Sequence, residues 1–160
     1  DDRYNETKVS NDGYNIFEKS RLKDTLKLLE TENKDSSDTL LLSSKIKSKL
    51  VSKNLCIGIR KETDTTKDGS TECSVLSKDT YLFSLMTPYE YMRASMDENC
   101  KILSDLSCSN YNYLSSSNQG SEWLLTATDQ NNYKSYSFTG TSLILSKAST
   151  FKRLRFILPK

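Results

Sequence analysis

The sequence predicts a single domain of helices and strands that is held together by two disulfide bonds. Three features support this prediction. Leucines recur at helical spacing in the first third, short alternating runs fill the last third, and four cysteines form two close pairs. A chain of 160 residues is long enough for one domain around one hydrophobic core. We therefore expect a domain over residues 14–160, preceded by a polar arm over residues 1–13.

The composition is polar, but it contains enough aromatic residues to indicate a folded chain. Hydrophobic residues make up 35%, and Ser and Thr together make up a quarter. Nine Tyr and five Phe argue against disorder. The net charge is only +2, and acidic and basic residues are mixed along the chain without a concentrated basic face. We therefore expect no nucleic-acid partner. The sequence also contains no apolar run as long as a membrane span.

The cysteine and histidine content narrows the function. Cys56 and Cys73 are 17 positions apart, and Cys100 and Cys108 are 8 apart, without a C-x-x-C motif. The chain has no histidine, the commonest catalytic base and metal ligand, so we expect no metal and no other cofactor. An even count at local spacing favours two disulfides formed in an oxidising compartment over free buried thiols. We therefore expect a protein outside the cytoplasm, either a mature chain whose export signal has been removed or a piece of a larger surface protein.

Three segments have helical signals. Asn15 or Ser20 is the expected cap of a first helix, whose buried face would carry Leu22, Leu26 and Leu29. Ser43 or Ser44 is the expected cap of a short helix in which Ile46 and Leu50 share a face. Thr87-Pro88-Tyr89-Glu90 places a cap, a first-turn proline and a capping-box glutamate in order, and predicts a helix to about Met96.

Strands are expected over residues 55–59, 81–86, 123–128, 133–138, 143–145 and 153–158. Residues 61–70 form a polar loop with Asp68-Gly69 as its turn, and Cys73 closes this loop back towards Cys56. The predicted core consists of Leu22, Leu26, Ile57, Phe83, Leu85, Met92, Trp123, Leu125, Tyr136, Phe138, Leu154, Phe156 and Leu158.

The order of several short motifs resembles a known family. These motifs are Phe17-Glu18-Lys19-Ser20 before the first helix, the segment 85–91, a Trp-Leu-Leu-Thr strand from Trp123, a Tyr-containing strand ending at Gly140, and the closing segment 154–158. Together they resemble the uncharacterised domains labelled DUF6273 in surface and exported proteins of Gram-positive bacteria. Residues 92–100, Cys108 and residues 110–114 resemble the cysteine-bearing branch. The resemblance covers roughly residues 14–160.

The resemblance implies an α+β domain with a small, twisted, mostly antiparallel sheet and two to three helices. This architecture is similar to the folds of the formylglycine-generating enzyme and the C-type lectins. Two positions depart from the family pattern, because Glu122 stands where a second tryptophan is usual and Phe156 follows Arg155 in place of proline. These are framework positions, so the departures affect local packing, and the fold by itself assigns no function.

Candidate binding residues lie in Tyr- and Asn-rich segments. Tyrosine supplies a rigid contact face and asparagine supplies paired donors and acceptors, a combination that suits glycans or protein surfaces. The alternative for these residues is a loop that packs on its own core, and Trp123 is expected in the core more than at a ligand. The candidates are Tyr111, Asn112, Tyr113, Trp123, Asn131, Asn132 and Tyr133.

Acidic residues at 64–68 and 97–99 could supply the oxygen ligands of a calcium site, but they lack the spacing of an EF-hand. We therefore expect them to lie in solvated loops that bind no calcium. The sequence has no G-x-S-x-G elbow, and we expect no enzyme activity.

The leading hypothesis is a non-catalytic, extracellular bacterial surface domain for adhesion or assembly, with a protein partner or self-association. Three alternatives stay open: a filament subunit that uses its N-terminal arm for β-augmentation, a lectin-like module that binds a glycan, and a hydrolase whose site lacks histidine.

Overall fold

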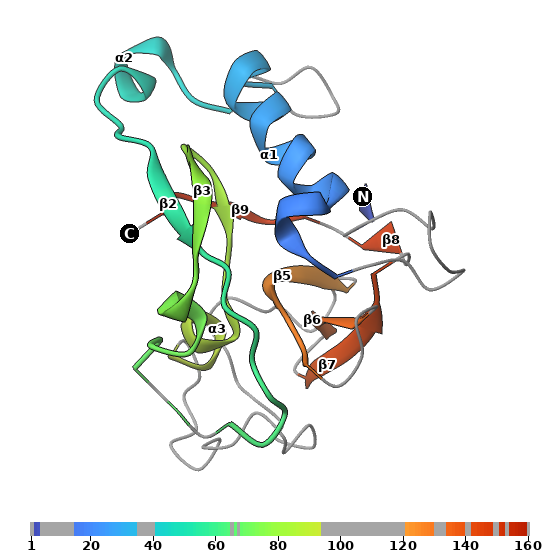
Figure 1. Cartoon of the computed structure of the whole chain (residues 1–160). Coiled ribbons are helices and arrows are strands. Elements are labelled where there is room, and N and C mark those ends of the chain that lie inside the picture. Colours follow the sequence, from blue (N-terminus) through green and yellow to red (C-terminus); the bar gives the residue numbers. More distant parts are fainter. Residues whose placement is uncertain are drawn as a thin grey trace.

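The computed structural model describes residues 2–3, 15–34, 41–64, 66, 68–93, 121–129, 134–139, 142–148, 151–152 and 154–159. Over these residues the chain is an α+β domain with three α-helices and small antiparallel sheets, as expected (Figure 1). The helices are α1 (Arg21–Glu32), α2 (Ser44–Lys47) and α3 (Pro88–Arg93), and single 3₁₀ turns form η1 (Phe17–Lys19) and η2 (Glu72–Ser74). None of the described helices has the length and apolar character needed to cross a membrane.

The strands form four antiparallel groups. The largest is the three-stranded sheet β5–β6–β7, and the other three groups are the pairs β1–β8, β2–β3 and β4–β9. The strands are β1 (Asp2–Arg3), β2 (Lys53–Cys56), β3 (Leu76–Tyr81), β4 (Ser84–Leu85), β5 (Glu122–Ala127), β6 (Lys134–Thr139), β7 (Ser142–Lys147), β8 (Phe151–Lys152) and β9 (Phe156–Ile157).

The first helix forms where its leucine spacing predicts. Ser20 is the cap, and its Oγ accepts a hydrogen bond from the backbone amide of Lys23 at 3.1 Å. Asn15, the other expected cap, instead donates to the carbonyl oxygens of Thr128 and Lys134 and so anchors this segment to the ends of β5 and β6. The buried face of α1 consists of Leu22, Leu26 and Leu29.

The second helix is capped as predicted but packs differently. Ser43 accepts a hydrogen bond from the amide of Ile46, yet the Ile46 side chain is exposed. The helix ends at Lys47, so Leu50 lies beyond it and packs against the core from the following turn. The expected shared face of Ile46 and Leu50 is therefore wrong, because a single helical turn does not extend to both positions.

Three predicted strands are shorter than expected or divided. β2 ends at Cys56, because the amides of the next two residues donate to the carbonyls of Val75 and Glu72 outside β3. Ile59, which the prediction placed in this strand, is 51% exposed. The predicted strand 81–86 divides into β3 and β4, which pair with β2 and β9. The predicted strand 153–158 likewise gives only β9, preceded by β8, which pairs with β1. Leu158 lies beyond β9 and is 44% exposed, so its assignment to the core is wrong.

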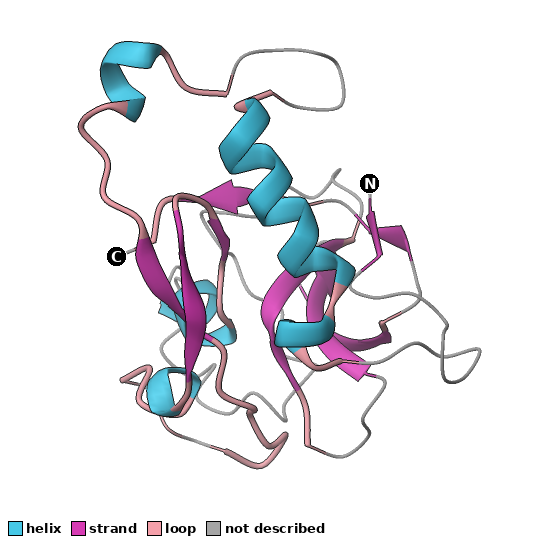
Figure 2. Cartoon of the chain, turned by 45° about the horizontal axis from the view of Figure 1, so that its top comes forward, coloured by secondary structure: helices cyan, strands magenta, loops and turns pink. Residues whose placement is uncertain are grey.

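The β5–β6–β7 sheet is covered on both faces, which explains why β5 is buried along its whole length. Trp123 and Leu125 pack with the leucines of α1, whereas Leu124 and Phe138 pack with Tyr91 of α3. In Figures 1 and 2, α1 lies alongside both the β2–β3 hairpin and this sheet. Most of the predicted core is confirmed. Ile57, Met92, Leu154 and Phe156 are only partly buried at its edge.

Two residues of the N-terminal arm are described. Asp2 and Arg3 form β1, which pairs antiparallel with Lys152 and Phe151 of the same chain. Residues 4–14 lie outside the described residues.

Candidate functional site

A cavity of about 240 Å³ lies where several segments of the chain meet. It is lined by the stretch from β2 to η2, by the start of α3, and by residues of β4, β5, β9 and the chain end that follows β9. Leu55, Leu125, Ile157 and the disulfide between Cys56 and Cys73 contribute to a mostly apolar wall. Asp68 and Cys73 also line the cavity and are exposed, so the cavity reaches the surface.

The disulfide holds one wall in place. Cys56 and Cys73 are bonded, as the sequence predicts, and they enclose residues 57–72. Gly58 lies inside this loop, where a side chain would collide with the carbonyl oxygens of Thr71 and Glu72. The amide of Gly58 donates to the Glu72 carbonyl at 2.7 Å. The loop therefore needs glycine at position 58 so that η2 can lie directly against the end of β2.

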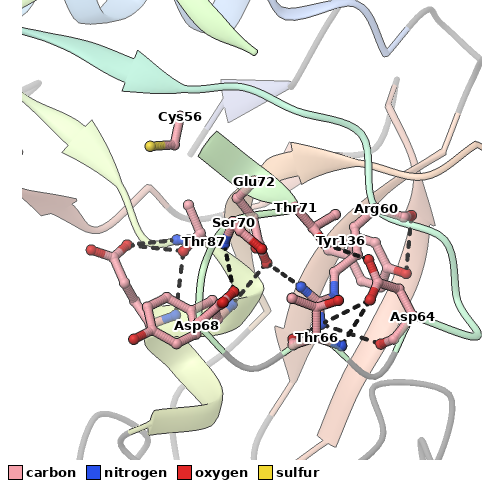
Figure 3. A network of polar contacts seen from close by, with 12 residues as sticks. Cys56, Arg60, Asp64, Thr66, Asp68, Ser70, Thr71, Glu72, Thr87 and Tyr136 are labelled. Carbon is pink, nitrogen blue, oxygen red and sulfur yellow. Dashed lines mark hydrogen bonds and ion pairs between the residues drawn. The ribbon is translucent and has the colours of Figure 1, made fainter. Parts of the chain in front are cut away.

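Glu72 is the buried acid of the site. Its Oε1 accepts hydrogen bonds from Arg60 Nη1 at 2.9 Å and from the backbone amide of Tyr89 at 3.2 Å. Its Oε2 is also buried, and it has no hydrogen-bond partner among the described residues. Figure 3 shows Glu72 between Arg60 on one side and Asp68 and Thr87 on the other. The carboxylate thus has one oxygen that is bonded within the protein and one that is buried without a hydrogen-bond partner among the described residues.

Arg60 is held from the other side by the loop that follows it. Its Nη2 donates to the carbonyl oxygens of Asp64 and Thr66. The carboxylate of Asp64 accepts from the Thr66 amide at 2.8 Å and from Thr71 Oγ1 at 2.6 Å. Burial alone would raise the pKa of Asp64, but these hydrogen bonds and the charge of Arg60 lower it to about 2. Asp64 is therefore a structural anion that fixes the loop around Arg60.

The start of α3 forms another wall of the cavity. Thr87 caps the helix as predicted: its Oγ1 accepts from the Glu90 amide at 3.3 Å, and Glu90 Oε2 accepts from the Thr87 amide at 2.9 Å. Tyr89 lies against Gly69, whose φ of +80° and close contact with the tyrosine ring both require glycine. The predicted Asp68-Gly69 turn is thus confirmed, and it packs on the helix.

The charges around the cavity are one-sided. Among the described residues that line it, Asp68, Glu72 and Glu90 are acidic and none is Lys or Arg. Hydrogen bonds from Ser70 lower the pKa of Asp68, which is exposed at this cavity. The arrangement can hold a positively charged or hydrogen-bond-donating group beside an apolar surface.

The structure describes one of the binding residues expected from the sequence, Trp123. Trp123 is only 1% exposed, and Lys152 Nζ lies 5.4 Å from its ring centroid, so the ring has no open face for a ligand. Burial lowers the pKa of Lys152. The other candidates lie outside the described residues; they are Tyr111, Asn112, Tyr113, Asn131, Asn132 and Tyr133. The predicted bridge between Cys100 and Cys108 and the acidic residues at 97–99 also lie outside the described residues.

Sequence reasoning missed Arg60 and Glu72. The sequence does contain one signal for them, because Arg60 follows Cys56 by four positions and Glu72 directly precedes Cys73. Both residues lie between the bonded cysteines, so closing the loop brings them towards one another. Their burial, however, depends on β5 and α3, which are distant in sequence.

Comparison of the chain with models of protein families, with curated proteins and with solved structures finds no match. The resemblance to the DUF6273 domains stays a prediction.

Proposed function

We propose that this chain is a non-catalytic, exported domain of a bacterial surface protein that binds a partner molecule for adhesion or assembly. Its binding site is the cavity beside the Cys56–Cys73 disulfide. The observation that carries this proposal is the cavity itself, which is lined in part by Glu72, a buried acid whose Oε2 has no hydrogen-bond partner among the described residues. A concave, mostly apolar cavity with a few polar groups is the usual form of a binding site.

Three further observations support the proposal: one concerns binding, one the compartment, and one the absence of catalysis. The cavity has mostly apolar walls with a few convergent polar groups, as small-ligand sites have. The disulfide is typical of an oxidising compartment. The chain contains no histidine, and the Glu90 carboxylate is engaged in the helix cap. We include in this proposal the C-type-lectin-like architecture that the family resemblance implies.

A hydrolase is the second candidate, because two acids that line the cavity, Glu72 and Glu90, are of the residue type that enzymes use in pairs for general acid–base chemistry.

The filament alternative has less support. Asp2 and Arg3 pair with β8 of their own chain, so strand donation to a neighbouring subunit would have to break this pairing.

Nuclear magnetic resonance of the methyl-labelled protein tests the proposal. We expect a set of small cationic, anionic and neutral compounds to include members that shift the methyl signals of Leu55, Leu125 and Ile157 with saturation. The signal of Val51, which is exposed and does not line the cavity, should stay unchanged. A bulky residue at the mouth, in Pro159→Trp, should abolish the shifts, and Val51→Trp should not.

Two outcomes would overturn the proposal. One is the absence of any saturable shift at the cavity methyls across the whole set of compounds. The other is turnover of ester, peptide or glycoside substrates that is lost in Glu72→Gln, which would favour the hydrolase.

A further inference from the structure

We propose that residues 43–53, the segment that carries α2, dock this domain on the surface of an anionic lipid bilayer. The segment lies among the lipid headgroups without crossing the bilayer, and the cavity takes no part in the contact. The inference goes beyond the proposed function, because it assigns the domain a second surface and a second kind of partner.

The first argument is the charge of the segment. It contains four lysines, at positions 45, 47, 49 and 53, and the sequence has no acid between Asp38 and Glu62. Basic clusters of this size on a surface segment are typical of proteins that bind anionic headgroups, and each lysine near the membrane raises the affinity about fivefold.

The acids nearby do not cancel this charge. Glu30 of α1 is paired with a lysine of its own helix at 3.5 Å. Glu32 and Lys34 balance one another in charge. Asp35 and Asp38 lie outside the described residues, and the four lysines outnumber them wherever they lie. The segment therefore keeps a net positive charge.

Three of the four lysines are available to a partner. Lys45, Lys49 and Lys53 are exposed, and none of them forms an ion pair with a described residue. Lys47 is half-buried, and its Nζ donates to the Glu30 carbonyl oxygen at 2.7 Å. This bond holds the segment to α1 on one side. Figures 1 and 2 show α2 at the periphery of the domain, so its other side is open.

The exposed hydrophobic side chains favour a lipid surface over a soluble polyanion. Ile46 is 50% exposed and Val51 is 76% exposed, and such side chains are stabilised when they enter the apolar boundary of a bilayer. A soluble polyanion offers them no apolar region. Ile59 and Val75 are also exposed, but each has a glutamate three positions away. Among these exposed residues, hydrocarbon and unopposed lysines thus occur together at α2.

Co-sedimentation of the full chain with lipid vesicles tests the proposal. We expect binding to vesicles of one part phosphatidylglycerol to two parts phosphatidylcholine, and at least tenfold weaker binding to phosphatidylcholine alone. Added salt should weaken the binding to the charged vesicles, because it screens the attraction between exposed charges.

A first variant tests the lysines. Lys45→Gln, Lys49→Gln and Lys53→Gln together should weaken binding to the charged vesicles at least twentyfold. The control makes the same change in net charge at three exposed lysines elsewhere, and it should weaken binding less than threefold. These control lysines are Lys19, Lys61 and Lys78.

A second variant tests the hydrophobic side chains. Ile46→Ser with Val51→Ser should weaken binding at least fivefold. The matched control is Ile59→Ser with Val75→Ser, which removes the same two side-chain types from exposed positions outside the segment and should leave binding unchanged. Each variant should keep the thermal melt of the wild type, because the replaced side chains are exposed.

Three outcomes would overturn the proposal. One is equal binding of the wild type to charged and uncharged vesicles, or binding to neither. Another is a loss of binding that is as large in the controls as in the α2 variants. The third is tighter binding to soluble polyphosphate than to vesicles, unchanged by the serine substitutions in α2 and after it, which would assign the segment to a soluble polyanion. None of these outcomes affects the proposed role of the cavity.

Discussion

Arg60 Nη1 lies 2.9 Å from Glu72 Oε1, and the two side chains are only 3% and 1% exposed. The arginine backbone is fixed independently, because its amide donates to the Ala127 carbonyl of β5 at 3.0 Å. The Glu72 backbone is fixed by η2 and the neighbouring disulfide. The ion pair therefore joins the disulfide loop to the main sheet and occupies one of the two carboxylate oxygens of Glu72.

Removing the arginine should be strongly destabilising. Arg60→Met would leave the Glu72 carboxylate buried without a positive partner, and we expect the free energy of unfolding to fall by about 3–5 kcal/mol. Urea denaturation measures this loss. The exposed neighbour offers a matched control, since Lys61→Met should change stability by less than about 0.5 kcal/mol. The double variant Arg60→Met with Glu72→Leu should recover part of the loss, and a stable single variant would show that the pair is dispensable.

The disulfide should stabilise the domain measurably. Replacing Cys56 and Cys73 by Ser should lower the free energy of unfolding by about 2–3 kcal/mol, because the bond restricts the unfolded chain over a separation of 17 residues. Denaturation without reductant measures the effect. Peptide mapping of the unreduced protein should recover Cys56 linked to Cys73, and it also tests the predicted link between Cys100 and Cys108. A link between Cys56 and Cys100 would contradict both pairings.

The capping box should contribute modestly to stability. Thr87→Ala removes the acceptor for the Glu90 amide, and the free energy of unfolding should fall by about 1 kcal/mol. Thr87→Ser keeps the hydroxyl oxygen and serves as the control. An unchanged denaturation midpoint and slope in Thr87→Ala would show that the cap contributes nothing.

The pH dependence of stability should show the ionised Asp64. Its pKa is lowered from 3.8 to about 2 in the folded protein, so folding favours the carboxylate. The stabilisation is therefore complete above about pH 4, declines as the pH falls, and is lost below about pH 2. It amounts to at most about 2 kcal/mol. Denaturation of the wild type and of Asp64→Asn from pH 6 to pH 2 should give curves that converge in acid, and parallel curves would contradict this assignment.

Truncation of two core side chains should lower the free energy of unfolding by different amounts. Leu125 is almost fully buried between α1 and the cavity, so Leu125→Ala should lower the free energy of unfolding by about 2–5 kcal/mol. Phe156 is only partly buried at the core edge, where its ring lies 6.3 Å from that of Phe83, and Phe156→Ala should cost less than Leu125→Ala. Equal losses in denaturation experiments would show that Phe156 is more deeply packed than the structure indicates.

Local patterns were sufficient to place the helix caps and one disulfide, but not to predict the packing of α2, in which Ile46 is exposed. The leucines of α1 and the Thr87 capping box depend on residues three or four positions apart, and such interactions form within a single helix. Strand ends were less predictable. The segments 81–86 and 153–158 have the pattern of continuous strands. The first is divided between β3 and β4, which have different partners, and the described part of the second forms only the short strand β9; no local sequence signal marks either boundary.

The amino-acid sequence by itself determined the α+β composition of the domain, the Cys56–Cys73 loop, the caps of its helices and most of its core, because each depends on short spacings or on apolar periodicity. Only the tertiary structure decided that Arg60 and Glu72 are buried together and that Glu72 lies beside a cavity. That arrangement requires β5, α3 and the chain end after β9 to meet around the disulfide loop. Desolvation of a charge depends on every segment that covers it, and these segments are up to about a hundred residues apart in the chain.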